Sequence, residues 1–175
     1  MEDVKSEIVK MSSRLRTVVT IALLLLPVLW IGDILQAHGV GYVDYGAPDK
    51  RLPLDAMPLW LRIAAALLRG AELIPIAGGL FTLRSLLGEW RDGEIFTTTT
   101  IAHFRRIGVC VILLAAVELA SSLAISQLAW LSGAANFAVH LNLNIAALLI
   151  GVLVMLLARI MHLGVGLQEQ ADRTI

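Results

Sequence analysis

Four long apolar stretches constrain the fold of this chain more than any other feature of its sequence. They run over residues 17–36, 59–83, 107–130 and 141–160. A helix crosses the hydrocarbon layer of a bilayer with about 20 mainly apolar residues, so each stretch is long enough to span it. Strands of a membrane barrel would show short alternating segments, whereas these stretches are continuous. The sequence therefore predicts an all-α fold, an integral membrane four-helix bundle.

Composition favours a single membrane domain over residues 1–175. Hydrophobic residues make up 58% of the chain and charged residues 16%, which is more apolar than a soluble domain of this size needs. The formal net charge is zero, so the balance gives no sign of a polyanionic partner. We expect contact with the lipid bilayer and no direct binding of nucleic acid.

The first apolar stretch is interpreted as a retained anchor and not as a secretory signal. The charged segment before it, residues 1–16, is long, and the apolar run outlasts a normal signal core. Leu35 is also a poor residue two places before a cleavage point at Ala37. We therefore expect a multi-pass chain.

Basic residues predict the side of the membrane on which each connection lies, because positively charged connections tend to stay in the cytoplasm. The basic residues of the N-terminal segment, the middle connection and the tail are Lys5, Lys10, Arg14, Arg16, Arg84, Arg91, Arg105, Arg106, Arg159 and Arg173. The stretch 131–139 has none, and aspartates offset those of the first connection. We expect both termini in the cytoplasm, an outer loop at 37–58, an inner loop at 84–106 and a cytoplasmic tail at 161–175.

The two longer loops differ in character. The outer loop is rich in Gly and Pro, a pattern of turns rather than of a folded insert, and we interpret it as a plain connector. The inner loop alternates apolar and charged residues, as a segment in the membrane interface would. Its threonine run, 97–100, predicts a cap for the helix leading into the third span.

Ionisable residues inside the spans carry the most informative chemistry, because a charge at membrane depth costs several kcal/mol unless it is paired or hydrated. Arg69 and Glu72 are three residues apart, so they share a helix face and are predicted to pair. Glu118 lies at about the depth of Glu72 if the two helices run antiparallel. This polar seam is either a proton, ion or ligand site or, as we favour slightly, a buried salt bridge that orients two helices.

Small residues predict where helices pack closely. Ala116, Ala120 and Ala124 form a stripe on the third helix, and a second stripe on the fourth comprises Asn144, Ala147, Gly151 and Ala158. Packing within one chain is the commoner use of such stripes, and a homo-oligomer is the alternative.

No cofactor, metal or catalytic set is predicted. The four histidines, His38, His103, His140 and His162, lie at span ends without the spacing of a metal site. No nucleophile accompanies Glu72 and Glu118, so an enzyme is the third choice of function.

Two stretches carry a more specific pattern. The inner segment 93–108 reads GEIFTTTTIAHFRRIG, and the tail 157–175 reads LARIMHLGVGLQEQADRTI. The residues that carry the pattern are Gly93, Phe96, Arg105, Arg106, Ile107, Gly108, Gly164 or Gly166, Leu167, Gln168, Glu169, Asp172, Thr174 and Ile175. In these two places the chain resembles a family of small bacterial membrane proteins known as domain of unknown function 2975. It departs from the family at Arg173, where the family has Leu, and at His162 and Leu163, where basic residues are usual.

The resemblance implies four spans, a bacterial inner membrane and no established activity. Members of the family often occur beside small helix-turn-helix regulators, which implies a partner among cytoplasmic transcription factors. The leading hypothesis is thus a non-enzymatic regulatory or interaction protein whose partner surface comprises Gly93, Phe96, Arg105, Arg106, Leu167, Gln168, Glu169 and Asp172. Packing of the loop and tail on each other is an equal alternative for that surface. The competing function is a small transporter or ligand-binding bundle that uses Arg69, Glu72 and Glu118.

Overall fold

The chain folds as an all-α bundle of four membrane-length helices. The computed structural model describes residues 2–36, 42–44, 51–53, 58–92, 97–133 and 144–172, with side chains over 10–32, 58–92, 97–133 and 144–165. The helices are α1 (Glu2–Gln36), α2 (Leu59–Arg91), α3 (Thr98–Leu131) and α4 (Ile145–Asp172). Each contains a segment long and apolar enough to cross a membrane: Lys10–Gly32, Leu59–Arg91, Thr98–Leu131 and Ile145–Val165. The predicted fold class is confirmed, and the chain is a multi-pass membrane protein.

The helices are longer than the apolar stretches from which they were predicted. α2 continues to Arg91 and α3 begins at Thr98, so the connection between them is much shorter than the predicted 84–106. Charged residues do not end a helix where it leaves the hydrocarbon layer, since they are good helix formers in water. Capping ends it instead. Thr97 has an extended backbone and its side chain accepts a hydrogen bond from the Thr100 backbone N–H at 3.2 Å, as predicted for this threonine run.

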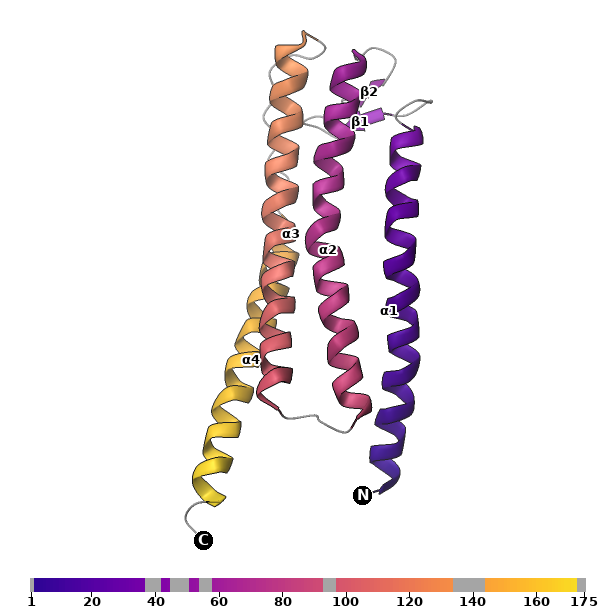
Figure 1. Ribbon diagram of the computed structural model, residues 1–175. Coiled ribbons are helices and arrows are strands. Elements are labelled where there is room, and N and C mark those ends of the chain that lie inside the picture. Colours follow the sequence, from indigo (N-terminus) through magenta and orange to yellow (C-terminus); the bar gives the residue numbers. More distant parts are fainter. Residues whose placement is uncertain are drawn as a thin grey trace.

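The helices are neighbours in chain order and run antiparallel. α2 lies between α1 and α3, and α4 packs along α3 (Figure 1). The start of α1, the end of α2, the start of α3 and the end of α4 lie at one end of the molecule, which we call the terminus end (Figure 1). The opposite end, with the two strands, is the hairpin end. Both termini thus share one side of the bundle, as an even number of spans requires.

The connection between α1 and α2 holds a short β-hairpin, which corrects the expectation of turns without a folded insert. β1 (Tyr42–Asp44) pairs antiparallel with β2 (Arg51–Pro53), with Val43 opposite Leu52. Two short strands meet across a turn-rich stretch, so the ladder satisfies backbone groups that would otherwise need water. At the same end, Trp60 and Trp130 are about half exposed, where interfacial tryptophans are expected.

α3 and α4 approach most closely where Gly108 faces Gly151. A Cβ on Gly108 would lie 2.9 Å from the Gly151 carbonyl oxygen, and one on Gly151 would lie 3.0 Å from the Gly108 carbonyl oxygen, so neither position has room for a side chain. Gly151 and Ala158 are buried, which confirms that the predicted stripe of the fourth helix packs within the chain. The alanine stripe of α3 behaves differently, because Ala116 and Ala120 are exposed and Ala124 is half-buried.

Candidate functional site

Four polar side chains from three helices meet near the middle of the bundle. Ser121 on α3 donates its hydroxyl to Oε1 of Glu72 on α2, with 2.5 Å between the oxygens. Glu118, one turn before Ser121, accepts a hydrogen bond on Oε2 from Nδ2 of Asn144 at 3.2 Å. We call Glu72, Glu118, Ser121 and Asn144 the mid-bundle cluster. It links α2, α3 and the start of α4.

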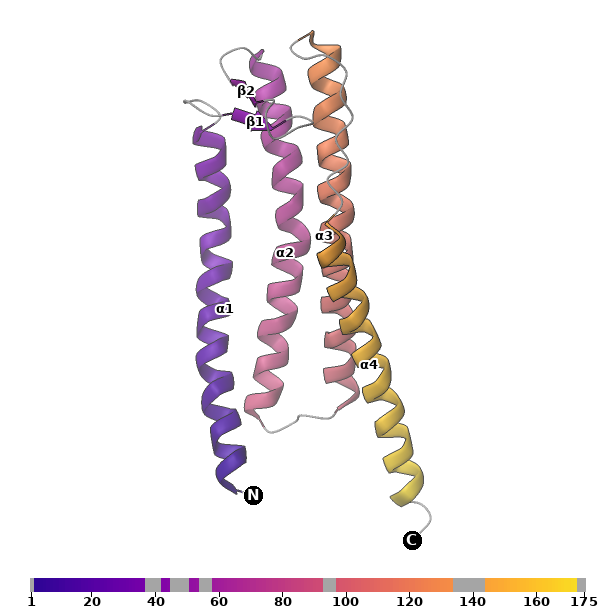
Figure 2. The same cartoon turned by 180° about the vertical axis from the view of Figure 1, so that it is seen from behind.

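The placement of α4 brings Asn144 into this cluster. Asn144 caps α4, because its Oδ1 accepts a hydrogen bond from the Ala147 backbone N–H at 3.0 Å. Its other side-chain atom reaches Glu118, which lies midway along α3, so α4 begins level with the middle of its neighbour (Figures 1 and 2). The positive end of the α4 dipole therefore lies beside the Glu118 carboxylate. Helix ends at this depth are a feature of membrane ligand and ion sites.

The mid-bundle cluster is rich in acceptors and poor in donors. An ionised carboxylate only accepts hydrogen bonds. Among the described side chains, Glu72 has one donor, Ser121, and Glu118 has one donor, Asn144. Two ionised carboxylates would leave two negative charges at membrane depth, where each costs several kcal/mol unless neutralised. A proton, a cation or the amino group of a ligand would stabilise this arrangement.

Arg69 does not supply that neutralising charge. Its side chain is exposed, and the ion pairs among the described residues include neither Arg69 nor Glu72. The predicted pairing of Arg69 with Glu72 is therefore not formed, although Glu72 and Glu118 do join one network, as their expected depths suggested. Helical spacing predicted that Arg69 lies on the same helix face as Glu72. The Glu72 carboxylate instead accepts its hydrogen bond from α3, and the Arg69 guanidinium is exposed.

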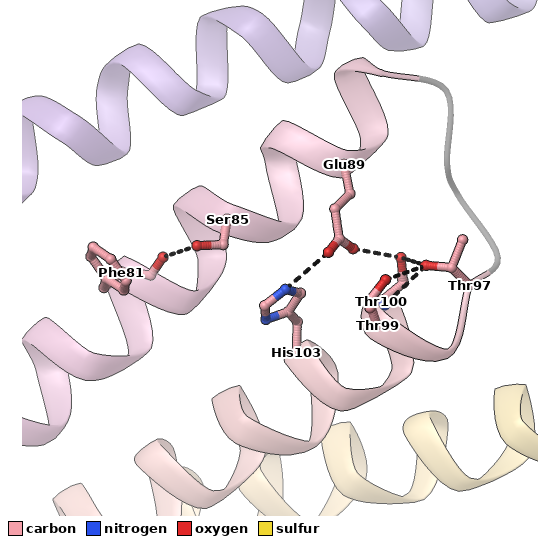
Figure 3. A network of polar contacts seen from close by, with 7 residues as sticks. All are labelled: Phe81, Ser85, Glu89, Thr97, Thr99, Thr100 and His103. Carbon is pink, nitrogen blue, oxygen red and sulfur yellow. Dashed lines mark hydrogen bonds and ion pairs between the residues drawn. The ribbon is translucent and has the colours of Figure 1, made fainter.

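A second polar cluster, at the terminus end, was missed by the sequence reasoning. Glu89 in the last turns of α2 accepts a hydrogen bond from the Thr100 hydroxyl at 3.0 Å and lies 3.1 Å from His103 Nε2 (Figure 3). Thr100 is fully buried and also bonds to the cap residue Thr97. We call Glu89, Thr97, Thr100 and His103 the terminus-end cluster. Only the antiparallel pairing of α2 and α3 brings these residues together, and no spacing within one helix indicates it.

The terminus-end cluster fastens the α2–α3 hairpin. With Glu89 ionised, His103 Nε2 must carry the hydrogen and donate it, so the ring is oriented by the carboxylate. His103 Nδ1 is buried and has no hydrogen-bond partner among the described residues. The rings of Trp90 and Phe104 lie beside the cluster with centroids 6.2 Å apart. Two helix ends are thus joined by polar and aromatic contacts.

The predicted partner surface is described only in part. Arg105 and Arg106 are exposed on α3. Gly93 and Phe96 lie outside the described residues. The backbone of Leu167, Gln168, Glu169 and Asp172 belongs to α4, and their side chains are outside the described set.

No metal centre is found within the described part of the chain, where no three His, Cys, Asp or Glu residues are placed to hold an ion. His103 bonds to Glu89, and His162 is exposed. His38 and His140 lie outside the described residues.

The family comparison gives a clear result. The family described as Protein of unknown function (DUF2975) matches residues 45–175, which is most of the chain. The chain belongs to the DUF2975 family. No curated protein and no solved structure matches it. Membership in DUF2975 confirms the resemblance seen in the inner segment and the tail, and it assigns no activity, because the function of the family is unknown.

Proposed function

We propose that this DUF2975 protein is a non-enzymatic regulatory or interaction protein of a bacterial inner membrane, and that it engages a cytoplasmic partner through its terminus end. The observation that carries the proposal is the extension of α4. The apolar stretch of the fourth helix is 141–160 in the sequence, but the helix continues to Asp172. The extension lies beyond the start of α3 in both views (Figures 1 and 2).

Residues 159–165 of α4 are largely exposed in the described part of the chain. Ala158 is 3% exposed and is the last buried side chain among the residues of α4 whose side chains are described. After it, Ile160 and Leu163 are more than half exposed, and Arg159 and His162 are exposed as well. A partner at the end of α4 would cover apolar side chains that the described part of the chain leaves open.

Charge supports the cytoplasmic orientation of the terminus end. The start of α1, the end of α2, the start of α3 and the end of α4 all meet there, and they bring together basic residues that are scattered in the sequence. A short connection or terminus rich in Lys and Arg tends to remain in the cytoplasm. The same argument supports an inner membrane, where a cytoplasmic regulator is accessible.

The proposed partner is a small helix-turn-helix regulator, and the contact is with its protein surface rather than with DNA. Exposed Arg105 and Arg106 provide positive charge at the start of α3. The α4 extension adds the acidic residues Glu169 and Asp172 in its sequence. A partner with charges of both signs would be recognised by such a mixed surface.

Co-purification of the full-length protein from its native membrane tests the proposal. Removal of residues 168–175, or Arg105→Gln with Arg106→Gln, should release the regulator. Arg91→Gln, another exposed arginine at the same end, serves as the matched control and should leave it bound. If the truncated protein retains every specific partner, the proposed surface is wrong.

A second candidate function, a small transporter or ligand-binding bundle, is favoured by the mid-bundle cluster. Glu72 and Glu118 supply two carboxylates within one hydrogen-bonded network across three helices. Proton and sodium uptake into vesicles holding the purified protein would test it. Glu118→Gln should abolish uptake without unfolding the protein, whereas Arg69→Gln reports whether the exposed guanidinium takes part. Uptake that is undetectable, or unchanged by Glu118→Gln, would refute a role for these carboxylates in transport.

A further inference from the structure

Arg16 of α1 and Arg84 of α2 mark the same boundary at the terminus end. Arg16 directly precedes the apolar stretch 17–36, and Arg84 directly follows the stretch 59–83. The Ser12 hydroxyl donates to the Leu87 carbonyl oxygen at 2.5 Å, which fixes the register of the two antiparallel helices. Each arginine lies about one turn from this bond in the direction of the hairpin end, so both lie at the depth where hydrocarbon gives way to lipid headgroups.

The two arginines also lie on one face of the α1–α2 pair. Arg16 Nη1 is 4.0 Å from the position that a Cβ on Gly88 would occupy. Gly88 follows Arg84 by one turn, and residues four apart lie on the same face of a helix. The Arg16 guanidinium therefore lies over the α2 face from which Arg84 projects. Both side chains are half-buried.

Neither guanidinium has an acidic partner among the described residues. The ion pairs described there join Arg91 to Asp92 and His103 to Glu89. Glu89 is the nearest carboxylate in sequence to Arg84, and its oxygens are bonded on the α3 side. Arg84 Nε is buried and has no acceptor among the side chains and backbone that the structure describes. Two like charges beside a buried N–H without an acceptor are costly, and a bound anion would relieve both costs.

We propose that Arg16 and Arg84 bind the phosphate of an anionic phospholipid between α1 and α2. A guanidinium presents parallel N–H donors that match phosphate oxygens, and two of them can hold one phosphate from two helices. Basic sites between transmembrane helices on the cytoplasmic side are known to bind anionic headgroups. The lipid-facing side of α1 adjoins the site, because Leu15 and Val18 are exposed, so acyl chains have an apolar surface to follow. This site is separate from the partner surface and does not depend on it.

Lipid binding to the purified full-length protein in detergent tests the proposal. Native mass spectrometry would measure the retention of phosphatidylglycerol, with phosphatidylcholine and inorganic phosphate as comparison ligands. Wild type should bind phosphatidylglycerol in preference to both. The Arg16→Gln, Arg84→Gln variant should bind it about tenfold more weakly or worse, since each basic residue near the surface contributes on the order of 1 kcal/mol.

Arg105→Gln with Arg106→Gln is the matched control, because it removes the same charge from exposed positions at the same depth on α3. It should retain phosphatidylglycerol as wild type does. If both double variants lose phosphatidylglycerol binding equally, the effect is one of general surface charge and the proposed site is wrong. The site is also wrong if the Arg16→Gln, Arg84→Gln variant binds phosphatidylglycerol as wild type does. Equal competition by inorganic phosphate would overturn the lipid as the source of the anion. Should the double variant fail to fold, the Arg16→Gln single variant is measured instead. Weaker phosphatidylglycerol binding than wild type would support the site, and unchanged binding would overturn it.

Discussion

The mid-bundle cluster and the terminus-end cluster use the same chemistry at different depths. In each, a glutamate on α2 accepts a hydrogen bond from a buried hydroxyl on α3: Ser121 for Glu72, and Thr100 for Glu89. Glu89 has a second partner in His103, whereas Glu72 has one described donor. Glu89 lies near the end of its helix, within reach of water. Loss of the hydroxyl donor on α3 should therefore cost more folding free energy at Glu72 than at Glu89, because no water can replace the donor at membrane depth.

The two clusters also differ in how many helices they join. The terminus-end cluster fastens one hairpin, α2 to α3, across a short connection. The mid-bundle cluster adds α4 through Asn144, which is both a helix cap and a donor to Glu118. Changes in the mid-bundle cluster should therefore disturb the tertiary structure more.

The largest effect is expected for Asn144→Ala. This change removes the cap of α4 and the donor to Glu118 together, and should lower the free energy of unfolding by about 3 kcal/mol. Asn144→Ser keeps a capping oxygen and should recover about 1 kcal/mol of that loss. Denaturant unfolding in detergent measures both variants. Equal losses in the two would show that the cap contributes little.

Ser121→Ala should have the next largest effect, about 2 kcal/mol, because it leaves Glu72 without its described donor at membrane depth. Ser126→Ala is the matched control on the same helix, since among the described residues that hydroxyl bonds back to the Ser122 carbonyl oxygen and to no other helix. The control should cost less than about 1 kcal/mol. A control that destabilises as much as Ser121→Ala would contradict the claim that the Glu72 bond matters.

Thr100→Val tests the other side of the comparison. Valine has nearly the same shape, so the change removes the hydroxyl bonds to Glu89 and Thr97 with little loss of packing, and should cost about 1 kcal/mol. Glu89 retains His103 and access to water. A loss larger than that of Ser121→Ala, in the same unfolding measurement, would reverse the proposed effect of depth.

The smallest effect is expected for Arg91→Gln, which removes an exposed ion pair with Asp92 at the terminus end. The Arg91 side chain is 52% exposed, so its pairing should contribute less than about 0.5 kcal/mol. A larger change in thermal unfolding would contradict the expectation that an exposed ion pair contributes little to stability.

Much of the fold could be predicted because apolar length is a local property. The stretches 17–36, 59–83 and 107–130 all lie inside observed helices. Their ends could not be predicted from hydropathy, since α2 and α3 continue through charged residues until capping stops them. The hairpin of β1 and β2 was missed because pairing of two three-residue strands depends on the connection between them rather than on a pattern within either strand.

The sequence predicted the two carboxylates of the mid-bundle cluster but not the side chains that donate hydrogen bonds to them. Glu72 and Glu118 stood out because charge is rare in apolar spans, whereas Asn144 was assigned to the packing stripe of the fourth helix. Arg69 was assigned to the seam by its spacing, but its side chain is exposed. A charge three residues away can point to either side of a helix face, and only the neighbouring helix decides which.

The sequence by itself determined that this chain crosses a membrane with four helices, because the cost of leaving apolar residues in water, or polar backbone in lipid, acts on each stretch independently. It also determined membership in the DUF2975 family. The tertiary structure decided where α4 begins, which carboxylate receives which donor, and that Arg16 and Arg84 share one face. These depend on the register between helices, which is set by contacts such as Gly108 with Gly151 and Ser12 with Leu87, between residues far apart in the chain.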